Sequence, residues 1–347
     1  MKLTRSLFIL TVTFFVAVSP VWAISLVDSG WLAKNLGKPD VRIVDVQDKS
    51  SNYAKEHIPG AVAVNRYVDL ADLNQAPPFL YPTAAEFEKV LSRLGIGKDT
   101  IVVAYDDKLS LFASRFLVIM EYFGHDVTKL KLLDGGLVNW KLEGNAVESA
   151  AAKVAPTTYK VASVNQNMLL TWSDVYRDVV QGMKPQIFLL DVRPGKEFNA
   201  ENIRGIRGGH LPKSVNVTGS DANDQKTHKF KPLADIQKMY ADKGATSDKE
   251  IYLYCHSGDR AAHAYVQIKH LLKYPALKLY PGGWEQWGGI ISLPAEGQVW
   301  LWDAPKQAPA ASEVKKPADI PAPATPVKVP PAAQSPPKKG GDMLQGC

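Results

Sequence analysis

The sequence has 347 residues, a length that corresponds to about two domains. With 46% hydrophobic and 22% charged residues it can bury a core, which excludes a wholly disordered chain, a collagen and a simple coiled coil. The net charge is +6, but the first 23 residues contribute +2 and the last 43 contribute +3. Because only +1 remains for the middle, we expect no basic face and no nucleic acid as a partner.

The N-terminus has the pattern of a secretory signal peptide over residues 1–23. Lys2 and Arg5 precede an apolar run over residues 7–18, and Val21 and Ala23 supply the small residues at the −3 and −1 positions of a cleavage site. The run is shorter than the roughly 20 residues that span a bilayer, and we expect no membrane span after cleavage. The protein is therefore expected to be exported, and periplasmic if the source is a Gram-negative bacterium. An uncleaved anchor is the alternative.

The last 43 residues, 305–347, differ in composition from the rest of the chain. They hold ten of the 24 prolines and no aromatic residue. Such a stretch buries too little apolar area to fold, so we expect a disordered tail. The tail ends in Cys347, and the chain has only one other cysteine, Cys255. Exported proteins normally pair cysteines in disulfides, whereas these two have the distribution of reactive thiols.

The middle of the chain contains one pattern twice, about 150 residues apart. The paired features are Asp45-Val46 and Asp191-Val192, each after an apolar run; His57-Ile58-Pro59 and His210-Leu211-Pro212; and Gly135-Gly136 with Trp140 and Gly282-Gly283 with Trp287. The period is that of a whole domain, far longer than a solenoid repeat. We therefore predict two tandem domains of one fold, over residues 24–150 and 151–304.

Each copy alternates apolar runs with helical patterns. Residues 101–105 and 251–254 are short apolar runs typical of buried parallel strands. Residues 113–120 and 261–272 then carry apolar side chains at helical spacing. This predicts an α/β fold in which each domain is a parallel sheet flanked by helices on both faces. Ligands bind at the carboxyl ends of such strands, so the loop after Tyr254 is the candidate site.

That loop has the sequence Cys255-His256-Ser257-Gly258-Asp259-Arg260 and leads directly into the predicted helix. A cysteine at this point faces unpaired backbone N–H groups and the helix dipole, which favour a thiolate. Gly258 permits a tight turn, and Arg260 adds positive charge. A persulfide is also an anion, so the loop can equally hold a sulfur atom on Cys255. The alternative is a buried cysteine that packs as a small hydrophobe.

These motifs resemble those of the tandem-domain rhodanese-like sulfurtransferases, over about residues 24–303. The resemblance implies that Cys255 takes a sulfane sulfur from a small sulfur-containing anion, such as thiosulfate, mercaptopyruvate or polysulfide. Cys255 then holds it as a persulfide and passes it to a thiophilic acceptor, which is a thiol, cyanide or a protein. No cofactor beyond this covalent persulfide is implied. The implied persulfide-binding residues are His256, Ser257, Gly258, Asp259 and Arg260.

The resemblance also separates the roles of the two copies. In the first copy Asp106 stands at the position of Cys255, and a carboxylate cannot carry sulfur, so the first domain is expected to be inactive. Asp191 and Arg193 are expected to support the loop through a buried ion pair. The histidines lack the cysteine or acidic companions of a metal site, so no metal is expected.

Four residues bear on the choice of donor. Glu197 stands where thiosulfate- and mercaptopyruvate-using relatives usually carry an arginine, and Asp259 adds negative charge to the loop. Both are expected to repel a dianionic donor. An insertion brings Arg204 and Arg207 toward the site, where they either contact the substrate or belong to a solvated loop.

Other functions stay open beside the enzyme. A carrier would load one sulfur and deliver it to a dedicated partner through the tail, and a scaffold would have lost the chemistry. Related phosphatases place five residues between Cys and Arg, whereas four stand between Cys255 and Arg260, and this smaller loop favours binding of sulfur over phosphate.

The tail has an r.m.s. reach of about 35 Å, so Cys347 is either a relay thiol for the Cys255 persulfide or an anchoring thiol.

Overall fold

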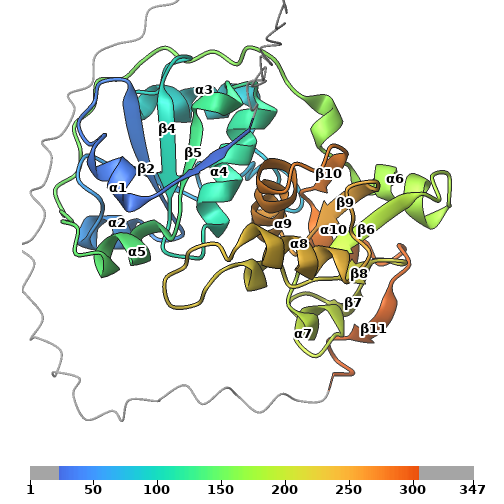
Figure 1. The fold of residues 1–347 in the computed structure, drawn as a ribbon. Helices are drawn as coiled ribbons and strands as arrows, with labels where there is room; N and C mark the ends of the chain where they lie inside the picture. The colour runs from blue at the N-terminus through green and yellow to red at the C-terminus, as the bar shows by residue number, and fades with distance from the viewer. Residues whose placement is uncertain (1–22, 305–347) are drawn as a thin grey trace, which may run out of the picture. The chain divides into compact units, whose positions relative to one another are not determined.

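The computed structural model describes residues 23–304, whose two halves both have an α/β fold (Figure 1). The first half contains β1 (Ser25–Val27), α1 (Ser29–Ala33), β2 (Val41–Gln47), α2 (Ser50–Lys55), β3 (Val62–Asn65), α3 (Ala84–Arg93), β4 (Ile101–Tyr105), α4 (Leu111–Tyr122), the 3-10 helix η1 (Val127–Lys129), β5 (Leu130–Leu133) and α5 (Gly136–Leu142).

The second half repeats the order of strands and helices from β2 to α5, with additions. It contains the 3-10 helix η2 (Gln166–Met168), α6 (Trp172–Val175), the π-helical turn η3 (Tyr176–Val180), β6 (Ile187–Asp191), α7 (Gly195–Phe198), β7 (Arg207–His210), β8 (Val215–Asn216), the 3-10 helix η4 (Gly219–Ala222), α8 (Leu233–Ala241), β9 (Glu250–Tyr254), α9 (Asp259–Tyr265), the π-helical turn η5 (Val266–Leu271), β10 (Leu277–Tyr280), α10 (Gly283–Gly289) and β11 (Glu296–Trp300).

Each half builds its own parallel sheet. The strand order is β1-β5-β4-β2-β3 in the first and β10-β9-β6-β8 in the second, with every pairing parallel. Strands β4 and β9 lie inside these sheets, which explains their continuous apolar runs. In the first half α3 and α4 pack on one face and α1 and α5 on the other. The predicted tandem α/β fold with parallel sheets is confirmed.

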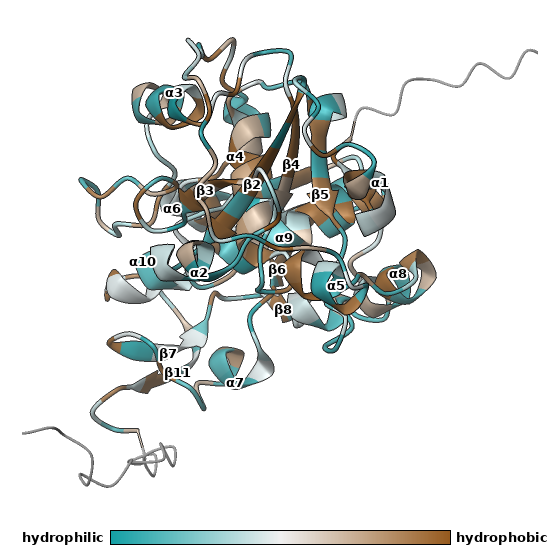
Figure 2. Ribbon diagram, turned by 90° about the vertical axis from the view of Figure 1, so that its left-hand side faces the viewer, coloured by the Kyte–Doolittle hydropathy of each residue, from teal (hydrophilic) through white to brown (hydrophobic). Residues whose placement is uncertain are grey.

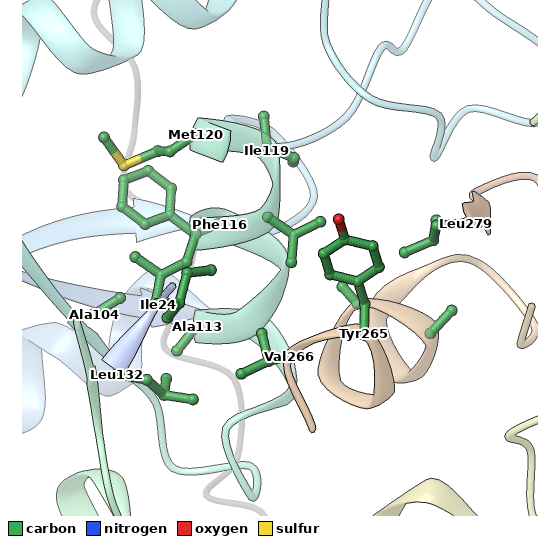
Figure 3. Close-up of a cluster of buried hydrophobic side chains, with 14 of the residues drawn as sticks. Ile24, Ala104, Ala113, Phe116, Ile119, Met120, Leu132, Tyr265, Val266 and Leu279 are labelled. Atoms are coloured by element: carbon green, nitrogen blue, oxygen red, sulfur yellow. The ribbon is translucent and has the colours of Figure 1, made fainter. Parts of the chain in front are cut away.

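The hydrophobic core continues from one half into the other through two helices. Figure 2 shows the hydrophobic colour along β2 and β4, at the centre of the first half. In Figure 3, Phe116 of α4 lies on the side of that helix that faces Ile24 and Ala104 of the first half, and Tyr265 of α9 lies on the opposite side. These side chains belong to one buried cluster. The helix that follows Cys255 is thus packed against the first half.

A small antiparallel ribbon was not predicted. Strand β11 pairs with β7 in the inserted segment, with Glu296 opposite His210 and Trp300 opposite Arg207. The ribbon is irregular between Glu296 and Val299. The pairing joins segments about 90 residues apart, so no local pattern announces it.

The predicted signal peptide, apart from Ala23, and the predicted tail with Cys347 lie outside the described residues. Within residues 23–304, none of the helices combines the length and the apolar character that crossing a bilayer requires.

Candidate active site

Cys255 lies at the carboxyl end of the second sheet, directly after the inner strand β9. The loop turns sharply into α9, whose N-cap Gly258 has a φ of 90°. A Cβ at Gly258 would lie 2.6 Å from Arg115 Nη1 and 3.2 Å from the carbonyl oxygen of Pro281. Glycine is therefore required here both by the left-handed backbone and by the space available.

The Cys255 side chain is buried, with 1% of the residue exposed, and it forms no disulfide within the described residues. The Gly258 N–H donates to Cys255 Sγ at 3.1 Å. An N–H directed at sulfur stabilises negative charge on it, and that charge is present in both a thiolate and a persulfide.

The start of α10 fixes the other side of the loop. The Trp284 N–H donates to the carbonyl of Cys255 at 2.8 Å, and the Glu285 N–H donates to that of His256 at 3.0 Å. A Cβ on Gly283 would lie 2.5 Å from the Cys255 carbonyl oxygen. The Gly-Gly-x-x-x-Trp motif therefore allows the helix to approach the loop and bind its carbonyl groups.

Glu197 is paired rather than free to repel a donor. Arg260 Nη1 and Nη2 donate to the two Glu197 carboxylate oxygens at 2.8 and 3.0 Å, and Arg204 Nη1 lies 3.5 Å from Oε1. Burial alone would raise the pKa of Glu197, but the hydrogen bonds and charge of Arg260 outweigh it and hold that pKa below its usual value. The expectation that Glu197 repels a dianionic donor is therefore corrected, because Arg260 compensates its charge.

Asp259 is likewise neutralised, and by residues of the first half. Arg66 Nε and Nη2 donate to its two carboxylate oxygens at 2.8 and 2.7 Å. Arg115 Nε lies 3.7 Å from Asp259 Oδ1. The Ser257 carbonyl accepts from Arg66 Nη2 at 3.2 Å and from Arg115 Nη1 at 3.1 Å. The expected repulsion by Asp259 is therefore corrected too, since two guanidinium groups face its carboxylate.

Asp191 and Arg193 form a buried ion pair at the end of β6. Arg193 Nη2 donates to Asp191 Oδ2 at 2.6 Å and to the Gly209 carbonyl at 2.8 Å. The guanidinium carbon also lies 5.0 Å from the centre of the Trp284 ring. The pair links β6, the inserted segment and α10 beside the loop, and all its charges are internally satisfied.

The two arginines of the insertion differ. Arg204 is 46% exposed and approaches Glu197. Arg207 is buried, and its nitrogens donate to the Gln298 side chain and to four carbonyl groups at the end of α10, those of Trp287, Gly288, Ile290 and Leu293. Arg207 thus has its donors engaged in fixing the ribbon, so both alternatives for this residue, a substrate contact and a place in a solvated loop, are wrong.

His256 is buried and uncharged at neutral pH. Burial, and to a lesser extent the charge of Arg204, lower its pKa from 6.5 to about 4. Its Nδ1 is buried without a hydrogen-bond partner among the described residues. A cationic His256 is therefore not available to bind an anion at neutral pH.

The first half carries a carboxylate where the second carries the thiol. Asp106 Oδ1 accepts from the N–H groups of Lys108 and Ser110 at 2.8 and 2.9 Å, and Oδ2 from those of Phe112 and Ala113 at 2.8 and 2.9 Å. Burial raises the pKa of Asp106 to about 6, although the backbone hydrogen bonds from Ala113, Lys108 and Ser110 act to lower it. This loop therefore binds its own anion.

Sequence reasoning missed three residues at the Cys255 loop. Arg66 and Arg115 come from the other half, and Glu285 follows the glycine pair of α10. The contacts of Arg66 and Arg115 with the loop span more than 140 residues of sequence, so no spacing pattern could reveal them. In the described part of the chain no cluster of three or more His, Cys, Asp or Glu side chains could hold a metal ion.

Residues 28–143 and 176–289 each match the family described as rhodanese-like domain. The chain is 30% identical over 285 residues to the sulfur carrier protein TtuD of Thermus thermophilus, which covers 79% of this chain and 97% of that protein. It is 31% identical over 282 residues to the thiosulfate sulfurtransferase of Corynebacterium glutamicum, which covers 78% of this chain and 90% of that protein.

Among solved structures, the 3-mercaptopyruvate sulfotransferase SseA from Escherichia coli is similar, with a TM-score of 0.67 and 26% sequence identity. The similarity covers 76% of this chain and 99% of that chain. The first matched segment of the present chain contains Asp106, and the second contains Cys255.

Proposed function

The chain belongs to the rhodanese-like family and is a sulfurtransferase, and we propose that it carries the transferred sulfur as a persulfide on Cys255. The observation that carries this proposal is the position of Cys255 Sγ. It lies at the end of β9, buried, with the Gly258 N–H donating to it at 3.1 Å. This is a thiol in a loop that stabilises anionic sulfur.

The transfer consists of two displacements at sulfur. With thiosulfate, the Cys255 thiolate attacks the outer sulfur, the S–S bond of the donor breaks, and sulfite leaves with the electron pair. The acceptor, cyanide or a thiolate, then attacks the outer sulfur of the persulfide and releases the Cys255 thiolate. The backbone of the loop and the ion pairs around it hold Cys255 in place, and the reaction needs no cofactor.

The first half is proposed to support catalysis without carrying sulfur. Asp106 occupies the position of the nucleophile, and its oxygens already accept the four loop N–H groups. Arg66 and Arg115 extend from this half to the catalytic loop. These contacts support a role in holding the loop.

A small anionic donor of the thiosulfate, mercaptopyruvate or polysulfide type is proposed. The names of the relatives support the first two, and the ion pairs of Glu197 and Asp259 remove the charge repulsion that the sequence suggested. The acceptor is a thiol, cyanide or a protein. The relative named as a sulfur carrier supports a protein acceptor.

Export is also proposed, on the sequence pattern of residues 1–23, with a periplasmic location if the source is Gram-negative. The tail, residues 305–347, is proposed to meet a protein partner, with Cys347 as a relay thiol or an anchor. Loading Cys255 with one sulfur and comparing persulfide lifetimes in wild type and Cys347→Ser separates these two roles, because only a relay shortens the lifetime.

Thiocyanate formation from thiosulfate and cyanide tests the function. The wild-type chain is expected to turn over many times, Cys347→Ser to do the same, and Cys255→Ser to form none. A single burst equal to the amount of protein would instead identify a carrier, and turnover by Cys255→Ser would overturn the proposal.

A further inference from the structure

Three arginines of the second half, Arg193, Arg207 and Arg260, donate to protein groups, whereas Arg204 is 46% exposed. Arg260 donates to both oxygens of Glu197, and Arg193 donates to Asp191 and to a carbonyl group. Arg207 donates to carbonyl groups and to one glutamine side chain. These pairings occupy donors of the three arginines, so we looked to the first half for a buried side-chain donor that acts beside the Gly258 N–H on an anion at Cys255.

Arg66 of the first half reaches the loop and is held rigidly there. Its side chain is fully buried, and Nε and Nη2 donate to the two Asp259 oxygens. Nη2 also donates to the Ser257 carbonyl at 3.2 Å. The rings of Tyr67 and Phe79 have their centres 4.7 and 5.1 Å from the guanidinium carbon. Two nitrogens therefore have fixed hydrogen-bond partners, and two aromatic rings pack against the group.

The third nitrogen, Nη1, is different: it is buried and has no hydrogen-bond partner among the described residues. A buried N–H donor without an acceptor is costly, so such a group points to a missing partner. Arg66 also lies within electrostatic range of the reactive sulfur. Burial lowers its pKa, but the charges of Asp259 and, to a smaller extent, of a Cys255 thiolate raise that pKa above its usual value.

We propose that Arg66, a residue of the noncatalytic half, is the anion-binding residue of the active site, with Nη1 donating to an anionic group at Cys255. That group is the negatively charged end of the sulfur donor or the outer sulfur of the persulfide. The inference rests on the proposed function of Cys255. Arg66 makes and breaks no covalent bond, and its other nitrogens keep Asp259 neutralised. The catalytic centre is thus completed by the half that cannot carry sulfur.

Two alkylating reagents of matched chemistry test this without sulfur transfer. Iodoacetate is an anion and iodoacetamide is neutral, and both alkylate thiolates. The measurement is the ratio of their rates at Cys255, read by peptide mass spectrometry so that Cys347 does not contribute. Arg66→Met is expected to lower the iodoacetate to iodoacetamide ratio by about tenfold or more. The control is Arg93→Met, since Arg93 pairs with Asp69 in the same half and is 53% exposed; it is expected to stay within about twofold of wild type.

A double variant separates binding from simple charge balance. Arg66→Met with Asp259→Asn removes one positive and one negative charge, so the net charge equals that of wild type. If Arg66 served only to neutralise Asp259, the rate ratio would return to the wild-type value, and the proposal would be overturned. We expect the ratio to stay several-fold below wild type, because the N–H donor is still missing. An unchanged ratio in Arg66→Met alone would overturn it as well.

Folding is checked by circular dichroism and thermal unfolding of each variant. If Arg66→Met does not fold, Arg66→Lys replaces it, since lysine keeps the charge but lacks the forked group that binds Asp259 and an anion together. A wild-type ratio in Arg66→Lys then overturns the proposal, and a reduced ratio supports it.

Steady-state kinetics with thiosulfate and cyanide give a second arm. Arg66→Met is expected to raise the KM for thiosulfate by about tenfold or more and to change kcat less. If wild type forms no Cys255 persulfide from thiosulfate, mercaptopyruvate or polysulfide, the proposed function fails, while the alkylation ratio still decides the role of Arg66. Equal KM values in wild type and Arg66→Met would overturn the inference about Arg66 and leave the proposed function of Cys255 standing.

Discussion

The Asp106 carboxylate occupies in the first half the place that Cys255 occupies in the second. The Leu137 N–H donates to the carbonyl of Asp106 at 3.0 Å, just as the Trp284 N–H donates to that of Cys255 at 2.8 Å. Four loop N–H groups bind the Asp106 side chain, whereas the Gly258 N–H donates to the Cys255 sulfur. The same loop geometry thus holds a carboxyl group in one half and a reactive sulfur in the other.

Substitution of Cys255 and substitution of Asp106 should therefore have unequal effects on turnover. Cys255→Ser is expected to abolish thiocyanate formation while the melting temperature stays near that of wild type, because the hydroxyl is similar in shape but a poor nucleophile. Asp106→Ala is expected to change turnover less than about twofold, since it removes no reacting group. Loss of most turnover in Asp106→Ala at an unchanged melting temperature would show that the roles of the halves are assigned wrongly.

Glu197→Gln should reduce stability and improve the use of an anionic donor. The substitution breaks a buried ion pair with Arg260, which is expected to lower the free energy of unfolding by about 2–4 kcal/mol. It also releases positive charge beside Cys255, so kcat/KM for thiosulfate should rise. Denaturant unfolding and steady-state kinetics measure the two effects. A fall in kcat/KM with normal folding would mean that the released charge does not reach the donor.

Gly258→Ala should damage the loop more than an ordinary glycine substitution. The residue has a φ of 90°, and a Cβ would meet Arg115 Nη1, so both the turn and the contact from the first half are disturbed. A loss of at least about tenfold in the rate of Cys255 loading is expected. Gly205→Ala, in the same half, is the control, because nothing lies within 4 Å of its Cβ position. Equal loading rates in the two variants would contradict the account of the loop.

His256 should make the fold sensitive to acid. Burial lowers its folded pKa from 6.5 to about 4, so the unfolded chain takes up the proton first as the pH falls. The contribution of neutral His256 to the free energy of unfolding is fully present above about pH 6.5. It is lost as the pH falls toward 4, which lowers that free energy by up to about 3 kcal/mol. His256→Gln does not titrate and should lack this loss. Denaturant unfolding of wild type and His256→Gln between pH 4 and pH 7.5 checks this difference. Parallel curves of unfolding free energy against pH would contradict the lowered pKa of His256.

Features of the structure that depend on residues adjacent in the sequence could be predicted. The apolar runs that became β4 and β9 are continuous because those strands are buried within parallel sheets. The position of Cys255 at a strand end follows from the run before it and the helical spacing after it. Repetition of the pattern then indicated a second copy of the same fold.

The charge balance of the site was not predictable, because it depends on contacts between distant residues. Glu197 and Asp259 suggested repulsion when only their own charges were considered. In the structure Arg260 pairs with Glu197 across 63 positions, and Arg66 pairs with Asp259 across 193. Arg207 was expected either to contact the substrate or to lie in a solvated loop, but it is buried at the ribbon of β7 and β11. A single sequence holds no local signal for such pairs.

The central claim is that Cys255 carries the transferred sulfur, and peptide-resolved mass spectrometry after incubation with thiosulfate, mercaptopyruvate or polysulfide tests it most directly. We predict that one donor adds about 32 Da, one sulfur atom, to the peptide that contains Cys255. The added mass should disappear when cyanide is supplied and should be absent from Cys255→Ser. An unmodified Cys255 peptide in a chain that still forms thiocyanate would contradict the account.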